Sequence, residues 1–227
     1  MNKAHSAIAF LLIALLLQNC SPKVAPYSHG PVMSQKSIKK SFEPILQFME
    51  IQPGVVFADV GASSGALTVM MATLMDSATV YIQDIDKMVL EENNLNKIID
   101  FYSKQSQRDL RKKNKFCLVI GDRNHTHLPD ATFDLIYSNA TVHVFDSPDS
   151  ILTDLSKKLK PNGKLFIRDC FKNDHGAGNF CADPSCAKPL RTIDEFLVMM
   201  KRNGFKLVKQ SPDMSGYPLF GFTLNEN

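Results

Sequence analysis

Along most of the chain, short hydrophobic runs alternate with segments whose hydrophobic residues recur every three or four positions. The first pattern is typical of buried strands, and the second is typical of amphipathic helices. Strands that alternate with helices indicate a parallel sheet covered on both faces. The strands expected from this pattern are 55–60, 79–84, 116–121, 133–138 and 164–169, and the helices are 37–50, 65–75, 87–103 and 151–159.

The C-terminal part of the chain follows a different order. A helix is expected over 192–201, with Asp194 and Glu195 in its first turn, where the helix dipole favours acidic side chains. Strands at 205–209 and 219–224 then follow closely enough to pair as an antiparallel hairpin. The expected fold is therefore α/β: a Rossmann-like, doubly wound, seven-stranded and mainly parallel sheet with an antiparallel C-terminal strand.

The N-terminus carries a separate signal. Lys3 precedes a hydrophobic run over 7–17, which is too short to span a bilayer but fits the hydrophobic region of a secretory signal. The stretch after Cys20 is rich in proline and polar residues, as in a linker. We expect a signal peptide at 1–19, a linker at 20–32 and one folded domain at 33–227.

Leu17-Gln-Asn-Cys20 resembles a bacterial lipoprotein signal, in which the cysteine becomes the lipidated first residue of the mature chain. The match is imperfect, because Gln18 and Asn19 stand where small residues are usual. The resemblance implies an exported protein, attached by a lipid on Cys20 to the membrane and facing the periplasm. The alternative is an uncleaved N-terminus that leaves the domain on the cytoplasmic face of the membrane.

Length and charge narrow the remaining possibilities. The 227 residues suit one sizeable domain, and the net charge of +3 is too small to indicate a nucleic-acid partner. Cys117 and Cys170 lie in hydrophobic strand patterns and are expected to be buried thiols. Cys181 and Cys186 lie in a loop, where an exported protein could form a disulfide. A metal site with His175 is the alternative, but the spacing is not that of a zinc knuckle, so no metal is expected.

The stretch between the first strand and the next helix contains Gly61-Ala-Ser-Ser-Gly65. In an open α/β sheet, ligands bind beyond the carboxyl ends of the strands, and glycines allow the backbone to approach them closely. Asp84 ends the second strand, where its carboxylate can accept both hydroxyl hydrogens of a ribose. Two cofactors satisfy this pattern: a nicotinamide dinucleotide and S-adenosylmethionine.

Four stretches in this order decide between the cofactors, because together they resemble the class I S-adenosylmethionine-dependent methyltransferases. The likeness covers about residues 37–224, although Ser63 replaces the usual middle glycine of the loop. Against the nicotinamide reading, no tyrosine is followed by lysine four positions later, and Ala66 replaces the third glycine of the dinucleotide pattern. The four stretches are D-V-G-A-S-S-G, V-Y-I-Q-D-I-D, G-D-R-N-H-T-H-L-P-D-A-T-F-D-L-I-Y-S-N-A-T-V-H and L-K-P-N-G-K-L-F-I.

The resemblance implies roles for particular residues. Asp84 would bind the ribose, Asp122 the adenine amine, and Arg123 would flank the adenine. Ser138 and Asn139 would face the methionine portion and the transferred methyl group. The cofactor-binding residues implied are Asp59, Gly61, Ser63, Gly65, Asp84, Asp122, Arg123 and Ser138.

A methyltransferase needs a base only if the nucleophile arrives protonated. The candidates follow the fourth and fifth strands: His143, Asp169 and His175, with Asn139 beside the methyl group. His143 also fits a core or capping role, and the loop over 171–190 is either a lid or a plain insertion. The acceptor, expected to be a small molecule, cannot be read from these residues.

The two halves of this picture conflict, because S-adenosylmethionine is made in the cytosol and an exported protein would need another source. The main hypothesis is an S-adenosylmethionine-dependent methyltransferase. The alternative is an exported, lipid-anchored binding module that reuses the fold without catalysis. Three acidic residues in cofactor-binding positions, Asp59, Asp84 and Asp122, favour retained cofactor binding.

Overall fold

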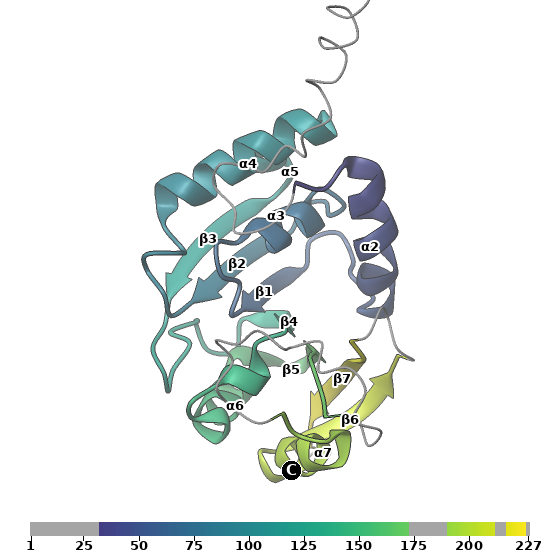
Figure 1. Ribbon diagram of the computed structural model, residues 1–227, viewed down its shortest axis with the longest axis vertical. Helices are drawn as coiled ribbons and strands as arrows, with labels where there is room; N and C mark the ends of the chain where they lie inside the picture. The colour runs from purple at the N-terminus through teal and green to yellow at the C-terminus, as the bar shows by residue number, and fades with distance from the viewer. Residues whose placement is uncertain (1–31, 173–189, 212–216, 226–227) are drawn as a thin grey trace, which may run out of the picture.

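The computed structural model describes residues 32–172, 190–211 and 217–225. Within them, seven strands form one sheet in the order β3-β2-β1-β4-β5-β7-β6 (Figure 1). The expected fold class is confirmed, because β1 to β5 are parallel and β7 is antiparallel to both of its neighbours. The strands are β1 Val56–Val60, β2 Thr79–Asp84, β3 Lys115–Ile120, β4 Phe133–Asn139, β5 Leu159–Arg168, β6 Phe205–Gln210 and β7 Leu219–Leu224.

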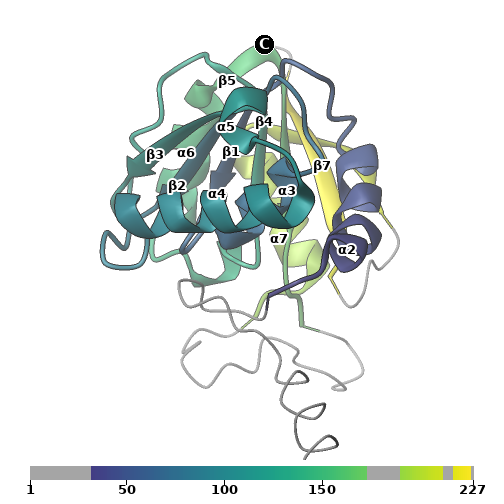
Figure 2. The same ribbon diagram turned by 90° about the horizontal axis from the view of Figure 1, so that it is seen from above.

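Helices cover both faces of the sheet. α2, α3 and α4 lie on one face, and α6 and α7 lie on the other (Figures 1 and 2). A single 3-10 turn, η1, follows β4. The helical elements are α2 Gln35–Phe48, α3 Ala66–Ala72, α4 Glu92–Ser106, α5 Leu110–Lys113, η1 Val142–Val144, α6 Pro148–Lys158 and α7 Ile193–Arg202.

The central strand β1 shows why both faces are covered. Side chains alternate along a strand, so Phe57 packs into the core on the α2–α4 face while Ala58 and Val60 pack into the core on the α6–α7 face. All three are almost completely buried. A strand that is apolar on both sides is stable only between two layers, and this fixes β1 and its C-terminal loop at the centre of the molecule.

The C-terminal hairpin completes the sheet. β6 and β7 pair as predicted, and β7 inserts between β6 and β5. A capping box between Thr192 and Glu195 begins α7. Phe196 of α7 then packs against Phe220 and Phe222 of β7. This packing holds the start of α7 close to the end of β5.

Two element boundaries differ most from the sequence expectation. The helix expected from residue 87 begins at Glu92, because the Glu91 carboxylate accepts from the N–H groups of Asn93 and Asn94 and caps it there. The residues before it form a turn, in which Asp86 accepts from the N–H of Met88. Strand β5 begins at 159 rather than 164, because its first residues pair with β4 through a register shift.

The cysteines give one correction. Cys117 is a free thiol but only partly buried, and Cys170 is buried but disulfide-bonded, so the expectation of a buried free thiol was wrong at both positions. The expectations for Cys20, His175, Cys181 and Cys186 fall outside the described residues. Within 32–172, 190–211 and 217–225, no helix is long and apolar enough to cross a membrane. The same residues contain no cluster of histidine, cysteine or carboxylate side chains suited to a metal ion.

Candidate active site

A cavity of about 280 Å³ lies at the carboxyl ends of the strands, where the strand order reverses between β1 and β4. This is the usual position of a ligand in an open α/β sheet. Segments that follow β1, β2, β3 and β4 all contribute to the cavity, so the sheet topology itself assembles it. The lining residues are Val60, Gly61, Gln83, Asp84, Ile85, Asp122, Arg123, Thr126, Thr141, Val144, Phe145, Asp146 and Ile151.

The two glycines of the first loop are required by the protein's own packing. Gly61 has a φ of +77°, and a Cβ there would lie 2.1 Å from Cγ2 of Thr141. Gly65 has a φ of +78°, and its Cβ would meet Ile82 and Leu95 at 3.0 Å. Gly61 lines the cavity, whereas Gly65 is not among the lining residues and faces the core. The sequence pattern therefore located the loop correctly, and packing explains its glycines.

Ser63, at the position of the usual middle glycine, keeps a backbone conformation that glycine favours. Its φ is +51°, which costs a non-glycine residue about 1 kcal/mol. The Ser63 N–H donates to Oδ2 of Asp84 at 2.6 Å, and the Asp86 N–H donates to Oδ1 at 2.9 Å. Ser63 is absent from the cavity lining among the described residues. Asp84 therefore fixes the loop while it also lines the cavity.

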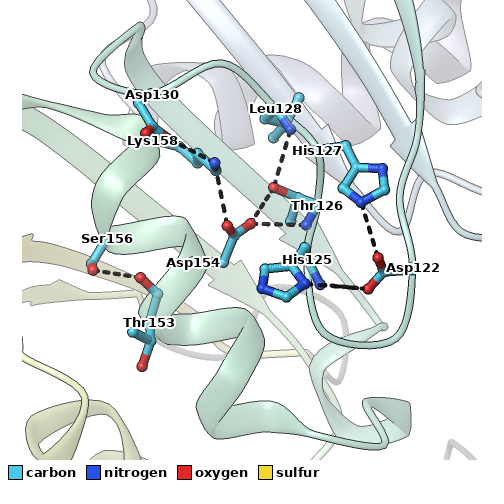
Figure 3. A network of polar contacts seen from close by, with 10 residues as sticks. All are labelled: Asp122, His125, Thr126, His127, Leu128, Asp130, Thr153, Asp154, Ser156 and Lys158. Atoms are coloured by element: carbon cyan, nitrogen blue, oxygen red, sulfur yellow. Dashed lines mark hydrogen bonds and ion pairs between the residues drawn. The ribbon is translucent and has the colours of Figure 1, made fainter.

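Asp122 organises the loop after β3 (Figure 3). Its Oδ1 accepts from the N–H groups of Asn124 and His125, and its Oδ2 lies 2.9 Å from Nε2 of His127. These hydrogen bonds lower the pKa of the Asp122 carboxyl. The carboxylate is therefore a pure acceptor at neutral pH, as binding of an exocyclic amine requires.

A buried polar network ties the same loop to α6 (Figure 3). Oδ2 of Asp154 accepts from the N–H of Thr126 at 2.8 Å and from its hydroxyl at 2.6 Å, and Lys158 lies 3.3 Å from Oδ1. Burial alone would raise the pKa of Asp154, but the hydrogen bonds from Thr126 and Lys158 outweigh it and lower the pKa. Lys158 also contacts Asp130 at 2.6 Å. The network holds Thr126, a lining residue, in place.

The segment after β4 supplies lining residues that the sequence reasoning missed. Val144 and Phe145 give the cavity an apolar wall, and Asp146 forms an ion pair of 3.3 Å with Arg123. The only signal in the sequence was the alternation of apolar and polar residues in Thr141-Val-His-Val-Phe-Asp, which fits a strand or a helix equally well. A single 3-10 turn presents these side chains instead.

Asp59 and Ser138 are buried and are not among the lining residues of the cavity. Asp59 is 2% exposed and accepts from the Thr68 hydroxyl at 2.6 Å. Burial raises the pKa of Asp59 to about 7, partly offset by this hydrogen bond, and the nearby Asp84 adds to the rise. The Ser138 hydroxyl donates to the carbonyl of Val60 at 3.0 Å, which joins β4 to β1. Their suggested contacts with cofactor stay predictions.

Asn139, at the end of β4, accepts two hydrogen bonds on the face of the sheet that α2 covers. Its Oδ1 accepts from the Tyr137 hydroxyl at 3.1 Å and from Arg168 at 3.0 Å. The Arg168 guanidinium also lies over the Tyr217 ring, 4.8 Å from its centroid. These contacts fix the Asn139 amide with its oxygen toward β5.

The structure brings two separately predicted residues together. Oδ1 of Asp169 lies 2.5 Å from Nδ1 of His143, and Oδ2 accepts from the His143 N–H at 2.9 Å. The Asp169 side chain is 3% exposed and the His143 side chain 9%. A buried carboxylate at Nδ1 holds the proton there, which leaves Nε2 as the basic nitrogen. This geometry is that of a supported general base.

The cavity suits an adenosyl ligand with a cationic tail. Asp84 and Asp122 offer acceptors for ribose hydroxyls and for an exocyclic amine, and Ile85 and Phe145 offer an apolar wall for a flat base. The lining contains three carboxylates, those of Asp84, Asp122 and Asp146, and one cationic side chain, that of Arg123. Negative charge is therefore in excess, which favours a cationic ligand. These residues therefore fit S-adenosylmethionine, which carries a sulfonium and an ammonium group.

Comparison with known proteins agrees with this geometry. Residues 58–167 match the methyltransferase domain family. A phosphoethanolamine N-methyltransferase of Triticum aestivum is 26% identical over 163 residues, which are 71% of this chain and 26% of the relative. The chain thus spans about a quarter of the length of the curated relatives it matches.

Solved structures share the fold. An S-adenosylmethionine-dependent methyltransferase from Aquifex aeolicus superposes with a TM-score of 0.61 at 19% identity, over 84% of this chain and 98% of that one. The [4+2]-cyclase SpnF superposes with a TM-score of 0.64 at 14% identity, over 97% and 94%. At these identities the likeness establishes the fold alone.

Fold and site together define an α/β domain with a nucleotide-type cavity at its topological switch point. Residues 58–167 match the methyltransferase domain family, and S-adenosylmethionine is the cofactor that this match and the cavity lining support.

Proposed function

We propose that the protein transfers the methyl group of S-adenosylmethionine to a small acceptor whose nucleophile arrives protonated, with His143 as the base. The observation that carries this proposal is the hydrogen bond between Asp169 and His143. His143 directly precedes Val144 in the sequence, and Val144 lines the cavity. A binding module would have no need for an imidazole oriented by a buried carboxylate. In the same proposal, Asn139 faces the transferred methyl group.

When bound, the cofactor supplies a methyl group already activated on sulfur. The chain's own residues then have three tasks. Asp84 and Asp122 orient the adenosyl portion, Val144 and Phe145 exclude water from it, and His143 accepts the proton of the nucleophile at Nε2. General-base catalysis of this kind contributes about 10²- to 10⁴-fold to the rate.

The acceptor is an amine in this proposal, supported by the names of the plant relatives, which act on phosphoethanolamine. We therefore expect methyl transfer to be found first with amines, phosphoethanolamine among them. The decisive assay follows labelled methyl transfer for the parent protein, His143→Gln and Asp169→Asn, with binding of S-adenosylhomocysteine measured beside it by calorimetry. Both variants should lose turnover by at least about 10²-fold while they keep product binding.

Two outcomes would overturn the proposal. If the parent binds S-adenosylhomocysteine but His143→Gln turns over normally, His143 is a structural residue. If the parent binds neither the cofactor nor its product, the anchored binding module becomes the better account.

We propose further that the protein is exported and anchored through a lipid on Cys20. The apolar run that ends in Leu17-Gln-Asn-Cys20 supports this, and so does the disulfide at Cys170, because disulfides persist in oxidising compartments. Mass spectrometry of the native protein tests it. A lipidated N-terminal Cys20 is expected, whereas an intact Met1 would place the domain on the cytoplasmic face instead.

A further inference from the structure

A second hollow, of about 650 Å³, lies beside the cofactor cavity on the α6–α7 side. His143 forms part of its wall, so the segment around η1 borders both spaces, with Thr141 and Val144 lining the first and His143 the second. The lining residues are His143, Pro148, Asp149, Lys172, Leu190, Arg191, Thr192, Glu195, Val198, Met199 and Arg202.

The charges in this hollow do not cancel. Arg202 is paired with Asp149, with its Nη2 2.6 Å from Oδ1. The Glu195 carboxylate accepts from the N–H of Thr192 at 2.8 Å and belongs to the capping box of α7. The lining therefore carries three cationic side chains, those of Arg202, Lys172 and Arg191, against two carboxylates, so positive charge is in excess.

The two remaining cations are Lys172 and Arg191. Both line the hollow. Neither forms a salt bridge with a carboxylate of the described residues, but the charge of Arg191, after the contacts of Arg202 and Asn203, helps to lower the pKa of Asp149. A hydrogen bond of 2.8 Å from the Lys172 N–H to the Arg191 carbonyl holds their backbones together. Lys172 follows Asp169 by three positions, so the segment after β5 that carries the partner of His143 also leads to these cations. Arginine and lysine side by side are the usual protein ligands of phosphate and carboxylate groups.

We propose that this hollow binds the methyl acceptor, and that Lys172 and Arg191 bind an anionic group on it, a phosphate in the first place. The acceptor class is then a small amine that carries a phosphate or phosphonate, with the anion at Lys172 and Arg191 and the amine toward His143. This inference rests on the proposed function, because it assigns a substrate to the same base. It adds a binding subsite outside the cofactor cavity.

The chemistry of this ligand has two sources, a free phosphorylated amine and the headgroup of an aminophospholipid. Two arms of one experiment separate them. In the first, calorimetry with S-adenosylhomocysteine present compares 2-aminoethylphosphonate with ethanolamine, which lacks the anion. In the second, co-sedimentation compares vesicles of phosphatidylcholine alone with vesicles that also contain phosphatidylethanolamine. Both arms use the full chain, Lys172→Ala, Arg191→Gln and, as a control, Lys201→Ala, an exposed lysine of α7 outside the hollow.

The expected result is that 2-aminoethylphosphonate binds the parent at least about tenfold more tightly than ethanolamine does. Each of Lys172→Ala and Arg191→Gln should remove most of this difference, and Lys201→Ala should keep it. A different outcome supports the same subsite with a lipid as its ligand. In that outcome, the two variants lose binding to vesicles that contain phosphatidylethanolamine, and the parent does not distinguish 2-aminoethylphosphonate from ethanolamine. If no ligand depends on Lys172 or Arg191 while S-adenosylhomocysteine still binds, the subsite is wrong and the proposed function stands. If S-adenosylhomocysteine does not bind the parent, it is the proposed function that fails.

Discussion

Arg123 and Asp146 form an ion pair of 3.3 Å that joins the loop after β3 to the segment after β4, and both residues line the cofactor cavity. Because both residues line the cavity beside Asp122, we expect their ion pair to close one side of it over a ligand that contacts Asp122. Its side chains are 76% and 45% exposed, so its contribution is small and sensitive to salt.

We expect Arg123→Ala and Asp146→Ala each to weaken binding of S-adenosylhomocysteine, with a coupling free energy of at most about 1 kcal/mol between them. The coupling should fall as salt is raised, because the charges are solvent-exposed. Calorimetry on the two single variants and the double variant, at low and high salt, measures it. Strictly additive effects at low salt would show that the pair does not act as a closure.

The buried network at Asp154 should control the stability of the loop at the cavity. Asp154→Asn leaves Lys158 with the exposed Asp130 alone and weakens both hydrogen bonds from Thr126. We expect the free energy of unfolding to fall by about 3 kcal/mol, the lower end for breaking a buried ion pair. Urea denaturation measures this loss. Asp130→Asn is the matched control: its carboxylate is 70% exposed, so a loss as large as that of Asp154→Asn would refute the assignment.

Asp59 should make the protein less stable as pH rises. Burial raises its pKa to about 7, whereas the unfolded chain releases the proton at about 3.9, so the folded state binds more protons between these values. The free energy of unfolding therefore falls across about pH 4 to 7. Asp59→Asn removes this contribution and should gain up to about 4 kcal/mol relative to the parent at pH 8, with little gain at pH 4. Urea denaturation at both pH values tests the difference, and an equal shift at both would contradict a titrating Asp59.

The sequence pattern predicted the sheet well because short apolar runs alternate with helical spacing from β1 to β5, and two closely spaced strands, β6 and β7, follow α7. Strand β1 and the hairpin of β6 and β7 are examples, and their pairing needed no information beyond hydrophobic spacing. The start of α4 was missed because the Glu91 cap lies within a stretch rich in acidic and amide side chains, where several residues offer the same signal.

The candidate site was predicted in part. Residues at the ends of strands, such as Asp84 and Asp122, were found because strand ends meet at one edge of a parallel sheet. The contact between His143 and Asp169 was not, since it joins segments 26 positions apart and depends on the 3-10 turn after β4. Ser138 was predicted from its position at a strand end; its hydroxyl donates to the carbonyl of Val60 on the neighbouring strand, and its contact with the cofactor stays a prediction.

Asp84 and Asp86 offer the sharpest test of the cofactor site, because both follow β2 and only Asp84 lines the cavity. The Asp84 carboxylate accepts from the N–H groups of Ser63 and Asp86, and one lone pair on each oxygen remains for a ribose hydroxyl. Asp84→Ala should therefore weaken binding of S-adenosylhomocysteine by about 1.5–3 kcal/mol, or roughly ten- to a hundredfold in Kd. It should also lower the thermal midpoint, since the Ser63 N–H loses its acceptor.

Asp86→Ala is the matched control for that change. Its side chain accepts from the N–H of Met88 and is exposed, so its loss should lower stability slightly and leave Kd unchanged. The backbone N–H of Asp86 that donates to Asp84 is kept in this variant, so the geometry of Asp84 is preserved. Calorimetry and thermal denaturation of the two variants separate the effects. If Asp86→Ala weakens binding as much as Asp84→Ala does, the ribose does not lie at Asp84, and the placement of the adenosyl group in this cavity must be revised.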